Sequence, residues 1–155
     1  MPIPAGPSST LPEWAPTREQ VAAHVPRRTL LGDVNGFGTA VATFTDATTP
    51  TGEQCDAIIL SACNWVLLVT GTLNAALSTT GADCAALRAA GLVELTWPDN
   101  REDLTDGELL LKLAESMRKD LAAANITLTG DDPTTDADDV LPVFVFDAAT
   151  SYDWI

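Results

Sequence analysis

The chain has 155 residues, 46% of them hydrophobic, which is typical of one domain large enough to bury a core. Its 8 Lys and Arg residues against 22 Asp and Glu residues give a net charge of −14. That balance argues against a protein that binds nucleic-acid phosphates or anionic lipid surfaces. The odd cysteine count does not suggest a disulfide framework, so Cys55, Cys63 and Cys84 are interpreted as small buried hydrophobic residues.

The first predicted element is an extended N-terminal arm over residues 1–16. This stretch is rich in proline and lacks the basic start and apolar run of a secretory signal. A helix is predicted next, over residues 17–25. Thr17 and Gln20 have the spacing of a capping box, and Pro26 cannot continue the helix.

The segment "DVNGFG" at residues 33–38 predicts a small hairpin turning at Asn35-Gly36. It also imitates the start of a calcium-binding loop. Phe37 and Phe44, however, occupy the fifth and twelfth positions of that loop, where oxygen ligands are needed. We therefore predict no metal site there.

The clearest helix signal runs from Thr51 to about Thr70. Thr51 and Gln54 repeat the capping-box spacing, and the helix that follows is apolar on most of its faces. Such a helix is expected either at the centre of a bundle or with one face against another subunit. Its candidate contact residues are Leu60, Asn64, Trp65 and Leu68. Asn64 is open to two interpretations, a buried amide that sets helix register or a solvent-facing notch.

Residues 57–82 contain no charged side chain, so a membrane span has to be considered. Polar residues are spread through the stretch, and neither end is closely flanked by Lys or Arg. Gly71 has the character of a helix end. The favoured interpretation is two separate helical segments, and a small membrane protein is the less favoured alternative.

Two further helices are predicted after this stretch. One spans residues 83–96 and ends where Pro98 follows Trp97. The other begins at a third capping-box pattern, Thr105 to Glu108, and is amphipathic. Its expected buried face consists of Leu110, Leu113, Ala114, Met117, Leu121 and Ala124. Its polar face offers the favourably oriented pairs Glu108–Lys112 and Glu115–Lys119.

Residues 126–155 have a different character. An acidic linker with an Asp cluster at 131–139 is followed by a β-prone run at 140–146, in which Pro142 permits only an edge strand or an extended arm. The linker is interpreted as hydrated chain in preference to a weak calcium site. The run either donates a strand to a neighbour or folds back on its own bundle. Its candidate contact residues are Val143, Phe144, Val145, Phe146, Tyr152 and Trp154.

The predicted organisation is therefore a mainly α chain. We expect a four-helix bundle over residues 17–125, an extended N-terminal arm over 1–16, and an acidic linker with an extended or β arm over 126–155. The sequence offers no catalytic constellation. His24 is the single histidine, which leaves no histidine-based metal cluster and favours a helix-end or packing role for this residue. We predict neither enzymatic activity nor a cofactor.

Three segments, in this order, resemble the head-to-tail adaptor (connector) proteins of long-tailed bacteriophages that infect actinobacteria. They are "TREQVAAHV" at 17–25, "FTDATTPTGEQCDAII" at 44–59 and "AAGLVELTWPDN" at 89–100. The second is similar to the Phe-Thr-x-x-Thr-x-Pro-Thr lead into that family's second helix. The third is similar to an alanine-rich helix that ends in aromatic-Pro-acidic. With the fourth predicted helix, the resemblance covers about two-thirds of the chain.

The resemblance implies a structural virion protein of the neck, at the capsid vertex, made in the host cytoplasm. It implies a ring of identical subunits, twelve-fold in symmetry, that docks under the portal protein and receives the next neck or tail protein. DNA would pass through the ring without specific binding. The alternative from a different class is a monomeric protein-binding module that uses its C-terminal arm.

Overall fold

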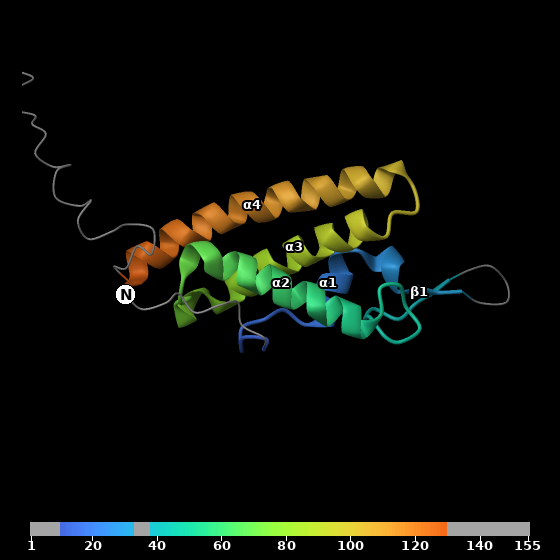
Figure 1. Cartoon of the computed structure of the whole chain (residues 1–155), viewed down its shortest axis with the longest axis horizontal. Coiled ribbons are helices and arrows are strands. Elements are labelled where there is room, and N and C mark those ends of the chain that lie inside the picture. The colour runs from blue at the N-terminus through green and yellow to red at the C-terminus, as the bar shows by residue number, and fades with distance from the viewer. Residues whose placement is uncertain (1–9, 33–37, 130–155) are drawn as a thin grey trace, which may run out of the picture.

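The structure, a computed structural model, describes residues 10–32 and 38–129, and this part of the chain is mainly helical (Figure 1). Its α-helices are α1 (Arg18–His24), α2 (Gly52–Thr70), α3 (Ser78–Thr96) and α4 (Arg101–Thr129). Two short 3-10 helices, η1 (Pro26–Thr29) and η2 (Ala75–Leu77), follow α1 and precede α3. Strands β1 (Leu30–Leu31) and β2 (Thr39–Ala40) pair antiparallel, as the predicted hairpin requires, and its Asn35-Gly36 turn lies outside the described residues.

Both of the first two predicted capping boxes are present. The hydroxyl of Thr17 accepts the backbone N–H of Gln20 at 3.3 Å, while Oε1 of Gln20 accepts the backbone N–H of Thr17 at 2.8 Å. Thr51 and Gln54 make the same pair of bonds at the start of α2, at 3.3 and 2.9 Å. These bonds satisfy backbone donors that a helix start leaves without partners. The α2 helix ends where predicted, with Gly71 at φ 62°.

The starts of the other two long helices differ from the prediction. The α3 helix begins at Ser78, not at 83, because η2 leads directly into it. The α4 helix begins at Arg101, ahead of the Thr105 pattern. Oδ1 of Asn100 accepts the backbone N–H of Asp103 at 3.0 Å, so Asn100 caps the helix one turn earlier. At its other end α4 runs to Thr129, four residues past the predicted boundary at 125.

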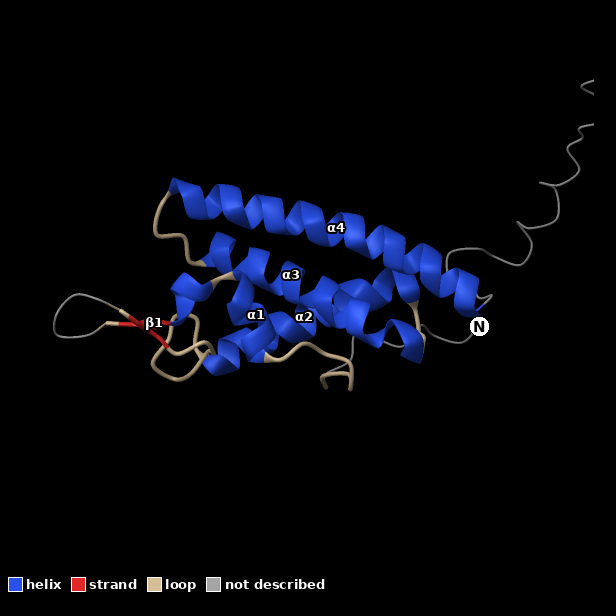
Figure 2. Ribbon diagram, turned by 180° about the vertical axis from the view of Figure 1, so that it is seen from behind, coloured by secondary structure: helices blue, strands red, loops and turns tan. Residues whose placement is uncertain are grey.

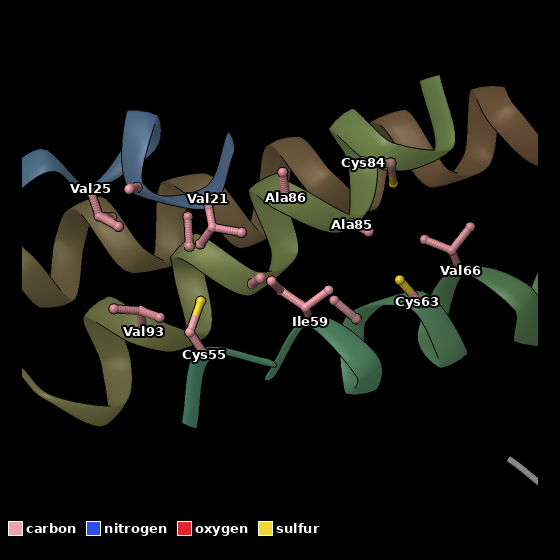
Figure 3. Packing of buried hydrophobic residues seen from close by; sticks show 14 of the residues in the cluster. Val21, Val25, Cys55, Ile59, Cys63, Val66, Cys84, Ala85, Ala86 and Val93 are labelled. Carbon is pink, nitrogen blue, oxygen red and sulfur yellow. The ribbon is translucent and has the colours of Figure 1, made fainter. Parts of the chain in front are cut away.

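The α3 helix is the centre of the described structure, with α4 along one side and α2 along the other (Figures 1 and 2). It also contacts α1. Its buried face consists largely of alanines, which let the neighbouring helices approach closely. Figure 3 shows Ile59, Cys63 and Val66 of α2 meeting this face, with Val21 of α1 on its other flank.

Two glycines mark the closest approach of α3 and α4. A Cβ placed on Gly91 would lie 2.8 Å from Cδ2 of Leu111 and 3.0 Å from the carbonyl oxygen of Gly107. A Cβ on Gly107 would lie 3.0 Å from Cγ of Leu95. Gly107 therefore serves close packing between the helices, inside what the sequence suggested was a helix start.

The described part of the N-terminal arm, residues 10–16, contains neither helix nor strand. Trp14 and Ala15 are partly buried against the hydrophobic core. At the other end of the domain, the acidic linker from residue 130 onward and the predicted C-terminal arm lie outside the described residues.

Candidate functional site

The predicted contact residues of α2 divide between two faces of the helix. Leu60, Asn64 and Leu68 recur every four residues and so share one face. Leu60 and Asn64 are half-buried, whereas 78% of Leu68 is exposed, the largest value among the exposed large hydrophobic residues described. With the exposed Ala57 and Ser61 they form an uncharged surface that we call the α2 strip.

Trp65 points elsewhere. The guanidinium of Arg118 on α4 lies 3.9 Å from its ring centroid and that of Arg88 on α3 lies 4.7 Å from it. Arg118 also donates to the backbone oxygen of Trp65 at 3.2 Å and pairs with Glu115 at 3.1 Å. Cation–π contacts of this kind stabilise by about 0.5–2 kcal/mol each. Trp65 therefore joins α2 to α3 and α4 within the same chain, and a role in partner contact stays a prediction.

Two details predicted for α4 differ in the structure. Glu115 pairs with Arg118, three residues on, in place of Lys119. Leu113, expected on the buried face, is 49% exposed, and Leu109 one turn before it is 55% exposed. The other members of the predicted face are buried or half-buried. Leu109 and Leu113 thus form an apolar, solvent-exposed strip along one side of α4.

The C-terminal candidates, Val143, Phe144, Val145, Phe146, Tyr152 and Trp154, lie outside the described residues, and their role stays a prediction. The Asp cluster at 131–139 lies there too. Within the residues that the structure does describe, no group of three or more His, Cys, Asp or Glu is placed to hold a metal ion. His24 is the exposed last residue of α1, the helix-end position expected of it.

Sequence reasoning missed the largest buried polar site, which is centred on Arg28 in η1. Its Nε donates to Glu94 of α3 at 3.0 Å, and its terminal nitrogens donate to Asp99 and Asp103, each at 2.8 Å. The side chains of Arg28, Glu94 and Asp103 are only 6%, 5% and 3% exposed. We call these four residues the Arg28 cluster. It ties η1 to the end of α3 and the start of α4.

Electrostatics favour the charged forms of Arg28 and Asp103. Desolvation by burial lowers the pKa of Arg28, but the hydrogen bond to Glu94 and the charges of the three carboxylates outweigh it and raise this pKa overall. The pKa of Asp103 is lowered, first by the backbone N–H of Asp99 and then, against the cost of desolvation, by the charges of Arg28 and Arg27. Every carboxylate in the cluster is therefore balanced by a donor.

A cavity of about 340 Å³ opens beside this cluster, walled by Arg27, Arg28, Asp99, Leu30 and Trp97 among others. Its two arginines are already engaged, because Arg27 donates to Asp103 at 2.8 Å. Two positive charges face the carboxylates of Glu94, Asp99 and Asp103, with Asp106 3.8 Å from Arg27. The cavity therefore has no surplus positive charge with which to hold an anion.

A second buried polar site was also missed in the sequence. Asn125, 1% exposed, donates to the backbone oxygens of Thr70 and Thr72 at 3.0 and 3.1 Å. Its side-chain oxygen accepts the backbone N–H of Asn74 at 2.8 Å. Asn125 is thus a buried amide of the kind considered for Asn64, which is itself half-buried and whose role stays a prediction. Its sequence signal was the spacing of four from Leu121 on the buried face of α4.

The cysteines are placed as expected. All three are fully buried and free. Burial raises the pKa of Cys55 and of Cys63 to about 12 and that of Cys84 to about 11. Thiols with such pKa values are protonated and unreactive near neutral pH, so they act as packing groups.

Comparison with protein-family models, with curated proteins and with solved structures finds no match for this chain. Among the described helices, none combines the length and hydropathy that crossing a membrane requires. Each of the three segments similar to phage adaptors includes a helix boundary: the caps at Thr17 and Thr51, and the end of α3 before Trp97.

Proposed function

We propose that this chain is the subunit of a head-to-tail adaptor ring in the neck of a long-tailed bacteriophage. In this proposal the four helices form a four-helix bundle and identical copies close a ring, about twelve-fold, beneath the portal protein. The ring extends the DNA channel and receives the next neck or tail protein. The chain assembles from the host cytoplasm into the virion and has no enzymatic role.

The α2 strip is the observation that carries the proposal. From Ala57 to Leu68 this face of α2 carries no charged side chain and ends in a leucine that is 78% exposed, on a chain with a net charge of −14. Soluble acidic proteins gain nothing from leaving such a face in water. A surface that another protein covers in the assembled state accounts for it.

The overall charge fits the same role. A channel through which DNA moves must not grip the phosphates, and an acidic wall repels them. The order of the three segments similar to phage adaptors adds support, since two of them coincide with capping boxes that the helices use. Both arguments favour a structural virion protein over a nucleic-acid-binding one.

The test is assembly of the full chain, alone and with the portal protein encoded in the same genome. Light-scattering mass, native mass spectrometry and negative-stain images would report a closed ring that binds one end of the portal. The control is the portal mixed with an unrelated acidic helical protein of similar size. A chain that stays monomeric and ignores the portal would contradict the proposal and favour a protein-binding module.

A further inference from the structure

We propose that the α2 strip of one copy packs against an apolar strip on α4 of the next copy, so that the subunits join head to tail. The inference rests on the proposed ring and deepens it, because it names the two faces through which the ring closes. The α4 strip consists of Leu109 and Leu113, with Leu110 and Met117 half-buried at its edge. Leu109 and Leu113 are one helical turn apart and share one side of α4.

Ring geometry requires two different surfaces on one subunit. A contact between identical patches gives a closed dimer, whereas a ring needs patch A of each copy to meet patch B of its neighbour. The α2 and α4 helices both flank α3 (Figures 1 and 2), and they meet each other where Arg118 stacks on Trp65. The described structure therefore carries two different strips, an uncharged one on α2 and an apolar one on α4, which is the arrangement that a head-to-tail contact needs.

The charges agree with this pairing. Copies of a chain with a net charge of −14 repel each other over most of their surfaces, so contact is favoured where negative charge is lowest. The α2 strip contains no charged residue. The chain's two lysines, Lys112 and Lys119, are both exposed on α4, and Lys112 adjoins Leu113 as the exposed Glu108 adjoins Leu109. The charges beside the two leucines therefore cancel, so the α4 strip repels an acidic neighbour less than a surface of average charge does.

The main experiment uses two variants of the full chain, Leu68→Glu on the α2 strip and Leu109→Glu on the α4 strip. A carboxylate in an apolar contact should raise the concentration at half-assembly at least about tenfold in either variant. Leu128→Glu is the matched control, because Leu128 is 53% exposed on α4 and lies outside the strip. Assembly is measured by sedimentation velocity, alone and on added portal, and circular dichroism checks that each variant is folded.

Mixing the two variants provides the decisive measurement. Each retains one intact face, so the α2 strip of Leu109→Glu can bind the α4 strip of Leu68→Glu. We expect dimers of one copy of each variant, and no larger species, in native mass spectra of the mixture. Ser61→Glu and Lys112→Glu repeat the test at exposed polar positions, should either leucine variant fail to fold.

The alternatives give different results. Loss of assembly in Leu68→Glu alone, with no mixed dimer, would show that two α2 strips pair with each other and would overturn the inference. Normal assembly of both variants would also overturn it and assign both strips to other occupants, such as the C-terminal arm. If the variants behave as expected but the wild-type oligomer does not bind the portal, the result supports the head-to-tail interface and contradicts the adaptor function. A wild-type chain that stays monomeric even with the portal defeats both.

Discussion

Replacing Arg28 with methionine tests how the described fold is held together. The substitution keeps most of the buried stem but removes the cation, which leaves Glu94 and Asp103 almost fully buried with fewer donors. Removing one partner of a buried ion pair costs about 3–5 kcal/mol, because the remaining charge has lost both water and counter-ion. We expect Arg28→Met to lower the free energy of unfolding by that amount, a large share of the stability of a domain of this size.

The matched control is Arg18→Met. Arg18 also makes a two-pronged contact with a carboxylate, that of Asp56, at 2.8 and 2.7 Å. The side chains of that pair are 36% and 42% exposed, so water can replace the lost partner. Urea unfolding followed by helical circular dichroism compares both variants with the wild type. If Arg28→Met lowered the urea midpoint no more than Arg18→Met does, the Arg28 cluster would not be a strong constraint on the fold.

The pH dependence gives a second readout of the same substitution. The folded pKa of Asp103 is lowered, so its contribution to wild-type stability is fully present above the unfolded pKa of about 4 and is lost as the pH falls through the folded pKa. Arg28→Met removes one of the charges that lower this pKa. The stability gap between variant and wild type should therefore be widest above about pH 5 and narrow on acidification. A gap that widened in acid would contradict this assignment.

Three further predictions concern buried groups elsewhere. Asn125→Leu should lower the free energy of unfolding, measured in urea, by about 2–4 kcal/mol, because buried backbone groups of the α2–α3 connection lose their partner. Thr127→Ala, at an exposed position, should leave that free energy nearly unchanged. Gly91→Ala should lower the free energy of unfolding by about 1–3 kcal/mol although alanine favours helix more than glycine does, because the new methyl group meets Leu111. Gly32→Ala is the control, since a Cβ at Gly32 would have no atom within 4 Å. The three buried thiols should resist Ellman's reagent at pH 8 in the native protein and all react in urea, because their pKa values of about 11–12 keep them protonated.

The features that the sequence predicts correctly are those set by residues close together in the chain. The helix starts at Thr17 and Thr51 were found because a capping box places both of its partners within four residues. The start of α4 was misplaced for a related reason. The Thr105 pattern satisfies the same rule, but Asn100 offers a cap one turn earlier, and a pattern alone does not say which of two caps is used.

The missed sites depend on contacts between distant parts of the chain. Arg28 meets Glu94 and Asp103 across 66 and 75 residues, a pairing that periodicity does not report. Asn125 stood at the end of the predicted bundle with no assigned role, because its partners belong to α2 and the α2–α3 connection more than 50 residues earlier. The exposed Leu113 was assigned to the core because a helical wheel gives the width of an apolar face but not the width of the neighbour that covers it.

These two polar sites lie at opposite ends of α4, and together they bear on the proposed ring. The Arg28 cluster fixes the first turn of α4 to η1 and α3, while Asn125 fixes its last turns to the connection that follows α2. A ring closes only if the angle between the two contact faces of every subunit is the same. Buried hydrogen bonds at both ends of α4 hold it at one angle to α2, so the α2 and α4 strips keep a constant relation. We therefore expect Asn125→Leu, which removes the hydrogen bonds at the end of α4, to assemble into oligomers of several sizes rather than one. Native mass spectra of this variant would show the mixture of sizes.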